Sequence, residues 1–318
     1  MPATSVAQQL ANVKALRTYV GKPFLQANER LWPLLPRQAR EQQMVRRYGR
    51  WLHSMVLLRD GDHRTQSLWT CFLRNRAELN YIGRLASAVP NGCTFRVAVL
   101  GCSTGAEAFS TVWAMRKANP NISLVVHASD IDAGAIKAAE AAIYRSDARE
   151  LSGLSDAERE ELFEPAGDGW RVRTQWREPI SWHVLDARQS GLAEWAGQHD
   201  LVLANRFLCH MSPAAARQCL RNVIDLVKPD GLLNVSGVDL GVRSAVTSQA
   251  GLTPVADTAE ELHNGDPTIL KCWPFNYFGL EPLDKSIPDW QRRYSVSYRK
   301  RGPGGSGHVT ANAMPVSS

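Results

Sequence analysis

The segment FRVAVLGCSTG, residues 95–105, decides the fold class of this chain. Its first six residues are a short apolar run that ends at a glycine, which is typical of a buried parallel strand. The residues that follow, from Thr104 to Lys117, predict a helix. A strand that leads through a glycine-rich loop into a helix presents backbone N–H groups to a ligand, and glycine permits the close approach and the backbone angles this needs. The loop has neither GxGxxG nor GK[ST] spacing, and we predict cofactor contacts at Gly101, Cys102, Ser103 and Gly105.

Further short apolar runs alternate with helical segments along the chain. Residues 124–128, 182–185, 201–204 and 232–235 predict strands, and residues 133–142 predict one of the intervening helices. Strands that alternate with helices indicate an α/β fold, here a Rossmann-like, doubly wound sheet.

The chain divides into three parts by composition. We expect a helical N-terminal region over residues 1–88, on the substrate side or as a lid, then a catalytic domain over 89–300, and a disordered Gly/Pro/Ser-rich tail over 301–318. Residues 37–58 form a basic amphipathic helix in this prediction. The chain shows no apolar run long enough to cross a membrane and no secretory signal at its start.

The basic charge lies in the first 80 residues. These contain 13 Lys+Arg and 5 Asp+Glu, a net of +8, whereas the remaining 24 basic and 26 acidic residues give −2. A basic face suits an acidic protein, an anionic lipid surface or nucleic acid, but it is also compatible with an ordinary solvated helix. Basic and aromatic residues do not interleave as they do in single-strand binders, so we expect no nucleic-acid partner.

The six cysteines and eight histidines are scattered, without CxxC or HExxH spacing. This predicts reduced thiols in a cytoplasmic protein and no metal site.

An acidic residue follows the second predicted strand at the position that a nucleoside cofactor requires. Asp130 lies in the segment SDID, residues 129–132, about 25 residues after the glycine loop. A carboxylate there can accept hydrogen bonds from both ribose hydroxyls, and the neighbouring Ile131 is predicted to contact the same cofactor. The alternative is that Asp130 only caps the next helix.

Several longer segments resemble the CheR-type methyltransferases, which use S-adenosylmethionine (SAM) to methylate receptor glutamates in bacterial chemotaxis. The resemblance covers roughly residues 65–240 and is far more specific than the glycine loop alone. It lies in the segments TCFLRN, GCSTGAEAFS, ASDIDAGAIKAAEAAIYR, LSDAEREELF, WRVRTQWREPISWHVLDA, DLVLANRFLCHM and VKPDGLL, in the family's order.

The resemblance implies a role for each matching residue. Thr70 and Arg74 would contact the methionine end of SAM and the reaction site, Asp130 the ribose, and Asp186 with Ala187 the adenine. Asn205 and Arg206 would lie near the methionyl group, and His210 would lie close to the transferred methyl.

The chain departs from the family's pattern in four ways. Ala106 stands where the family has the first glutamate of GEEP, which is a cofactor contact there. Whether Glu107 replaces that contact is open from the sequence. A family asparagine is Leu68, the family's Arg-Asn pair is reversed at Asn205-Arg206, and a family tyrosine is His210. These changes do not affect the cofactor prediction, but they leave the identity of the acceptor open.

A carboxylate acceptor needs alignment with the methyl group more than it needs a strong base, because it is already ionised at neutral pH. Arg74 and Arg206 could hold one carboxylate oxygen while the other attacks. His210 could orient the same group, or act as a base for an amine or hydroxyl acceptor. Alternatively, His210 is a buried structural histidine before the turn at residues 212–213.

The segment LKCWPFNYFGL, residues 270–280, suggests an acceptor with a hydrocarbon part. Such an aromatic cluster can line an apolar pocket, although it can equally be packing of a longer C-terminal unit. The preferred hypothesis is carboxyl methylation of a small acyl substrate, such as a 3-hydroxy fatty acid, to a methyl ester that serves as a quorum-sensing signal. The alternatives are a protein glutamate on a chemotaxis receptor, an amine or hydroxyl of a natural product, and a non-catalytic SAM-binding regulatory module.

Overall fold

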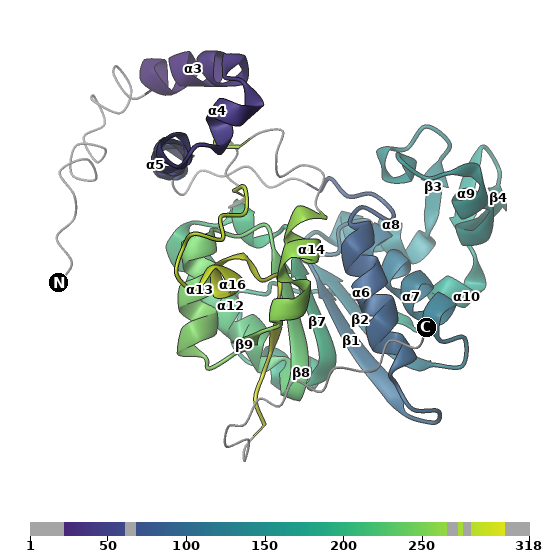
Figure 1. The fold of residues 1–318 in the computed structure, drawn as a ribbon. Helices are drawn as coiled ribbons and strands as arrows, with labels where there is room; N and C mark the ends of the chain where they lie inside the picture. Colours follow the sequence, from purple (N-terminus) through teal and green to yellow (C-terminus); the bar gives the residue numbers. More distant parts are fainter. Residues whose placement is uncertain (1–21, 61–67, 266–272, 276–280, 303–318) are drawn as a thin grey trace, which may run out of the picture.

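The computed structural model describes residues 22–60, 68–265, 273–275 and 281–302. Its centre is a seven-stranded sheet in the order β6-β2-β1-β7-β8-β10-β9 (Figure 1). The first five strands of this order pair in parallel, and β10 is antiparallel to both of its neighbours. The order confirms the predicted Rossmann-like, doubly wound α/β fold. The strands are β1 (Thr94–Leu100), β2 (Ser123–Asp130), β6 (Ile180–Val184), β7 (His199–Asn205), β8 (Val227–Ser236), β9 (Thr253–Pro254) and β10 (Ser297–Arg299).

Alternate residues of the central strands supply the two faces of the core. In β1, Val97 and Val99 belong to one buried cluster, and Ala98 and Leu100 belong to the other. Because side chains alternate across a strand, both faces of the sheet are apolar and both must be covered by helices. Helices α6 and α7 cover the first face, and α12 and α13 cover the second (Figure 1). The helices of this core are α6 (Arg76–Ser87), α7 (Ala106–Ala118), α8 (Ala133–Ala141), α11 (Leu192–Ala196), α12 (Pro213–Asp225), α13 (Leu240–Gln249), α14 (Ala259–Asn264) and α16 (Trp290–Tyr294).

Helix α6 lies before residue 88, where we expected the N-terminal region to end, yet its buried face belongs to the core of the sheet. Leu79 and Ile82 of α6 lie in the same buried cluster as Phe109 and Met115 of α7. The helix begins at Arg76. Asn75 caps it by accepting a hydrogen bond from the backbone N–H of Glu78 at 3.2 Å, and residues 68–75 therefore run outside the helix towards the glycine loop.

A second, three-stranded sheet supports the segment before α6. It consists of β3 (Ile143–Arg145), β5 (Gly169–Val172) and β4 (Phe163–Ala166), in that order, with α9 (Asp156–Leu162) and α10 (Thr174–Arg177) beside it. Phe72 packs edge-on against Tyr144 and Phe163. The Tyr144 hydroxyl donates to the carbonyl of Thr104 at 2.5 Å. This sheet therefore links the glycine loop to the chain that precedes α6.

The described N-terminal helices form a separate small core. They are α3 (Lys22–Leu31), η2 (Trp32–Leu34), α4 (Arg37–Glu41) and α5 (Gln43–Asp60), and Figure 1 shows them at one end of the molecule. The helix predicted over residues 37–58 is interrupted at Gln42, where ψ is 139°. Leu25, Trp32 and Leu52 enclose Trp273 in one buried cluster, with Phe275 at its edge. Trp273 and Phe275 therefore pack against the N-terminal helices. Residues 270–272 and 276–280 of the predicted aromatic segment lie outside the described residues, as do residues 1–21, 61–67 and most of the predicted tail.

Within the described ranges, no helix is both long and apolar enough to cross a membrane, and no group of three or more His, Cys, Asp or Glu side chains is arranged to hold a metal ion.

Three histidines on the sheet predict acid sensitivity. His127 of β2 lies 2.9 Å from the ring nitrogen Nε2 of His199 on β7, and it packs edge-on against His183 of β6. Burial, with the nearby charge of His127 and Arg96, lowers the pKa of His199 to about 4. Such a histidine contributes its full stabilisation when the pH is above its pKa in the unfolded state, about 6.5. This contribution is lost as the pH falls towards the folded-state pKa of about 4.

We expect the free energy of unfolding to fall between pH 7.5 and pH 5, by about 2 kcal/mol from His199 alone. Urea unfolding at the two pH values measures the loss. The His199→Gln variant should lose less stability than the wild type, and His263, whose pKa burial also lowers to about 4, contributes equally in both proteins. An identical loss in both would show that His199 does not carry this effect.

Candidate active site

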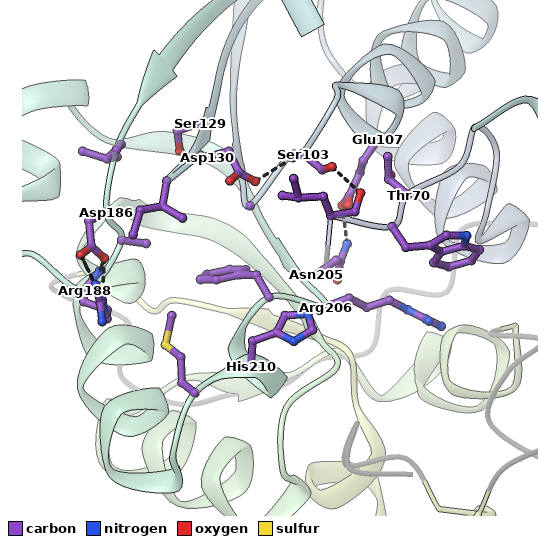
Figure 2. A pocket seen from close by; sticks show the side chains of 18 of the residues that line it. Thr70, Ser103, Glu107, Ser129, Asp130, Asp186, Arg188, Asn205, Arg206 and His210 are labelled. Carbon is purple, nitrogen blue, oxygen red and sulfur yellow. Dashed lines mark hydrogen bonds and ion pairs between the residues drawn. The ribbon is translucent and has the colours of Figure 1, made fainter. Parts of the chain in front are cut away.

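The carboxyl ends of β1, β2 and β7 border a cavity of about 230 Å³ (Figure 2). This is the edge of a doubly wound sheet at which ligands bind. Nearly all of the predicted site residues come together here, although they are spread over more than 140 positions of the chain. The lining residues are Leu68, Trp69, Thr70, Arg74, Gly101, Ser103, Glu107, Ser129, Asp130, Ile131, Leu185, Asp186, Ala187, Arg188, Asn205, Arg206, Phe207, His210 and Met211.

The glycine loop has its shape for two steric reasons. Gly101 has φ +66°, and a Cβ there would lie 2.7 Å from the Cβ of Phe207. Gly105 has φ +93° at the start of α7, and a Cβ there would lie 2.8 Å from the ring of Trp182. Gly105 and Cys102 are not among the lining residues, because Gly105 is packed beneath the loop and the Cys102 side chain is buried in the core. The predicted cofactor contacts of these two residues thus remain a proposal. In the structure, both residues shape the loop.

The carboxylate of Asp130 is held in place by the backbone. It accepts hydrogen bonds from the N–H of Ser103 at 2.8 Å and from the N–H of Asp132 at 3.0 Å. The cap of α8 is Asp132, which accepts from the N–H of Ala135 at 2.7 Å. Since the helix already has its cap, the alternative that Asp130 serves only as that cap is removed. Each Asp130 oxygen keeps a second lone pair for a ligand hydroxyl in the cavity.

Arg188, which sequence reasoning did not find, holds Asp186 at one end of the cavity. The guanidinium donates to both carboxylate oxygens, with nitrogen–oxygen distances of 2.6–3.0 Å (Figure 2). This contact lowers the pKa of Asp186, so its carboxylate stays ionised. Ala187 follows it along the wall, and Ile131 lines the cavity while remaining 45% exposed.

A group of polar side chains forms the opposite end of the cavity. The amide nitrogen of Asn205 donates to Glu107 at 2.8 Å, and the Ser236 hydroxyl donates to the amide oxygen of Asn205 at 2.7 Å. Arg74 lies 3.7 Å from the other Glu107 oxygen. Burial raises the pKa of Glu107, whereas Arg74 and Asn205 favour its ionised form.

Of the two adjacent positions 106 and 107 at the start of α7, only one faces the cavity. Ala106 is fully buried in the core, whereas Glu107 lines the cavity. A side chain at position 106 therefore points away from any ligand here. The position of the family's first glutamate therefore contributes no side chain to this cavity, and Glu107 is the acidic side chain that α7 contributes to it.

Arg206 and His210 lie at the same end, and Thr70 lines the cavity beside them (Figure 2). Arg206 has φ +58° directly after β7. Burial and the neighbouring charge of Arg74 lower the pKa of Arg206 to about 10, so it remains a cation at neutral pH. His210 ends the short helix η4 (Leu208–His210) and lines the cavity while half-buried, which favours a ligand-facing role over a purely structural one.

Sequence reasoning missed one further acidic residue behind the cavity. Glu78 is 7% exposed and accepts a hydrogen bond from Asn205 at 3.1 Å. It lies on the apolar face of α6 beside Leu79 and Ile82. A charged residue in an apolar helical stripe was the signal that could have found it.

Residues 69–243 match the protein family described as "CheR methyltransferase, SAM binding domain". The chain belongs to the CheR methyltransferase family. The match spans more than half of the chain and includes every residue that we placed in the cavity except Leu68. It confirms the resemblance seen in the sequence, and with it SAM as the cofactor.

Two curated relatives carry the name "Probable biofilm formation methyltransferase WspC". The protein from Pseudomonas aeruginosa is 24% identical over 191 residues, which are 58% of this chain and 44% of the relative. The protein from Pseudomonas putida is 25% identical over 198 residues, which are 61% of this chain and 44% of the relative. The chain thus spans less than half of the length of these relatives.

Solved methyltransferase structures are similar at low scores. A magnesium protoporphyrin IX methyltransferase from Synechocystis PCC 6803 with bound SAM is 14% identical, with a TM-score of 0.33 over 67% of this chain and 86% of that one. The N-methyltransferase NodS from Bradyrhizobium japonicum WM9 is 17% identical, with a TM-score of 0.32 over 57% and 83%.

The residues of the cavity fit SAM at both ends. Asp130 offers free lone pairs at the end of β2, where a ribose would lie. Glu107 offers a carboxylate at the other end, and a SAM molecule carries cationic ammonium and sulfonium groups in its methionyl part. Asp130, Asp186 and Asn205 line this cavity, and their contacts with SAM remain predictions.

Proposed function

We propose that this CheR-family chain transfers the methyl group of SAM to the oxygen of a carboxylate. SAM supplies an activated methyl group, so the protein has to bind, orient and exclude water. The observation that supports a carboxylate acceptor is the pair of cations Arg74 and Arg206 beside His210 at one end of the cavity. A guanidinium can hold one carboxylate oxygen and leave the other free to attack.

We further propose that the carboxylate belongs to a glutamate of a protein, as in the family that the chain resembles. Leu68 and Trp69 line the cavity and are 40% and 45% exposed, so the cavity reaches the surface beside them. Trp273 and Phe275, which suggested a hydrocarbon acceptor, pack against the N-terminal helices instead. Arg30 and Arg47 of those helices are exposed and suit an acidic partner.

Transfer of a radiolabelled methyl group tests this proposal. The purified chain is incubated with methyl-labelled SAM and either glutamate-rich receptor fragments or a panel of fatty and 3-hydroxy fatty acids. Acid-precipitable label that mild alkali releases as methanol supports a protein carboxyl ester. We expect such label to fall as salt is raised, because a surface charge contact is screened.

Other outcomes select the competing functions. Solvent-extractable label from the acid panel would replace the protein acceptor by a small acyl substrate. Alkali-stable label would contradict carboxyl methylation altogether. Binding of SAM with no transfer to either panel would favour a non-catalytic, regulatory module.

Arg206→Gln should reduce turnover by tenfold or more, since a charge-assisted hydrogen bond contributes about 1.5–3 kcal/mol. The matched control is Arg149→Gln, at a position that does not line the cavity, which should leave turnover within about twofold. Unchanged turnover in Arg206→Gln would remove this residue from the acceptor site.

A further inference from the structure

Glu78 and Glu107 are two carboxylates held together by one amide. The amide nitrogen of Asn205 donates to Glu107 Oε1 at 2.8 Å and to the two oxygens of Glu78 at 3.1 Å and 3.2 Å. An amide has only two N–H bonds, so one points to each glutamate. The Ser236 hydroxyl donates to the amide oxygen and fixes this orientation.

A second amide holds Glu78 from the other side. Asn234 of β8 is fully buried, and its amide nitrogen donates to Glu78 Oε1 at 3.0 Å. Two buried amides thus hold a side chain that would otherwise be excluded from an apolar helix face. In these contacts the Glu78 oxygens act as acceptors for the two amides. Their remaining lone pairs can still carry a proton.

The charges that face Glu78 come from three neighbouring segments. Glu107 of α7 is negative, and Arg74 before α6 and Arg206 after β7 are positive; the Cys71 thiol lines the same small cavity. Burial and the charge of Glu107 together raise the pKa of Glu78 to about 7. The protonated form of Glu78 is therefore populated near neutral pH.

We propose that Glu78 is a proton-linked positioning residue, which holds a proton behind Glu107 and releases it to solvent when the cationic methionyl end of SAM binds beside Glu107. The O–H bond of the Glu78 carboxyl group breaks, its electron pair stays on the carboxylate, and the proton passes to water or buffer; the ligand cation then takes over the neutralising effect of that proton. This inference rests on SAM as the cofactor and is independent of the acceptor.

The electrostatic reason is that an added cation favours the ionised form of both carboxylates. Before binding, two buried negative charges repel one another, and a proton on Glu78 relieves this repulsion. After binding, the ligand ammonium stabilises Glu107 directly and Glu78 through the shared Asn205. Both carboxylates line a cavity of about 30 Å³, which is large enough for a water molecule that would accept the proton.

Calorimetry with S-adenosylhomocysteine (SAH) tests the coupling without any methyl transfer. SAH lacks the sulfonium charge and keeps the α-carboxylate, so its ammonium group is the one ligand cation that this test probes. The ammonium group stays protonated between pH 6 and pH 7.5, where the measurements are made. Titrations in phosphate and in Tris at pH 7 differ by the number of protons released times the difference in buffer ionisation enthalpy. We expect a net release of protons on SAH binding at pH 7, and an affinity that rises by several-fold from pH 6 to pH 7.5.

Glu78→Gln isolates the residue, because it keeps the acceptor oxygen and removes the titration. This variant should bind SAH with little dependence on buffer or pH in the same range. The matched control is Glu140→Gln on the exposed side of α8, which should behave as the wild type.

Two results would overturn the proposal. One is a wild-type affinity that does not change from pH 6 to pH 7.5, which can be measured even if Glu78→Gln fails to fold. The other is a buffer dependence in Glu78→Gln equal to that of the wild type. Failure of the proposed acceptor would instead appear as missing methyl transfer with the proton release intact.

Discussion

Asp130→Ala should weaken SAH binding by about a hundredfold or more while the protein remains folded. Two ribose hydroxyls that donate to one ionised acceptor contribute about 1.5–3 kcal/mol each, and both contributions are lost together. The variant also leaves the N–H groups of Ser103 and Asp132 without their carboxylate partner, so the glycine loop loses its support as well. Titration calorimetry with SAH measures the effect directly.

The control lies two residues away. Asp132→Ala makes the same change at the cap of α8, where Asp132 accepts from the N–H of Ala135. It should lower the free energy of unfolding by about 1 kcal/mol, as loss of a helix cap does, and should change SAH affinity by no more than about twofold. Equal losses of affinity in the two variants would mean that Asp130 acts through the helix and not through the cofactor.

Asp130→Asn separates charge from shape. The amide can still accept from one backbone N–H but not with the strength of a carboxylate. We expect an affinity between those of the wild type and Asp130→Ala. Wild-type affinity in Asp130→Asn would argue against an ionised ribose acceptor.

The part of the fold that the sequence predicts well is the part built from buried parallel strands. A strand covered on both faces must be apolar at consecutive positions, and this is why residues 95–100 and 201–204 are recognisable without any partner. The glycine loop and Asp130 follow from the same logic, since they come directly after such strands. The three-stranded sheet was missed because β4 and β5 are four residues long and contain proline, glycine and charged side chains.

The site was predictable where its residues follow strands and not where a contact depends on packing. Asn205 ends β7 and Arg206 follows it directly, so their position can be inferred from the strand. Glu78 enters the site only through Asn205 and Asn234, which are distant in the sequence, and no local pattern states such a pairing. Arg188 pairs with Asp186, two residues before it, but only the folded structure shows that this pair lines the cavity. The orientation of Glu107 against Ala106 likewise needed the helix to be placed on the sheet.

The second large effect is expected on the stability of the N-terminal helices when Trp273 is replaced. Its ring fills the small core between α3, η2 and α5, packing edge-on against Trp32 at a centroid distance of 5.4 Å. Replacing a buried tryptophan by alanine costs about 3–5 kcal/mol. We expect Trp273→Ala to loosen the helices from the rest of the chain, although the salt bridge of Arg50 with Asp284 at 3.0 Å remains. Hydrogen exchange of the α5 amides should speed up by about a hundredfold or more, and those of β1 should not change.

Substitution of Gly49 tests the same packing, because its effect on stability should change sign when the Trp273 ring is removed. Gly49 lies inside α5, where glycine is about 1 kcal/mol worse than alanine, so Gly49→Ala would normally stabilise the helix. Here a Cβ would overlap the ring of Trp273, with the closest ring carbon 2.1 Å away. We therefore expect Gly49→Ala to destabilise the docked helices in the wild type and to stabilise α5 in the Trp273→Ala background, where the ring is absent. Stabilisation in both backgrounds would show that Trp273 does not pack on Gly49, because only direct contact between the two residues can reverse the sign of the helix propensity.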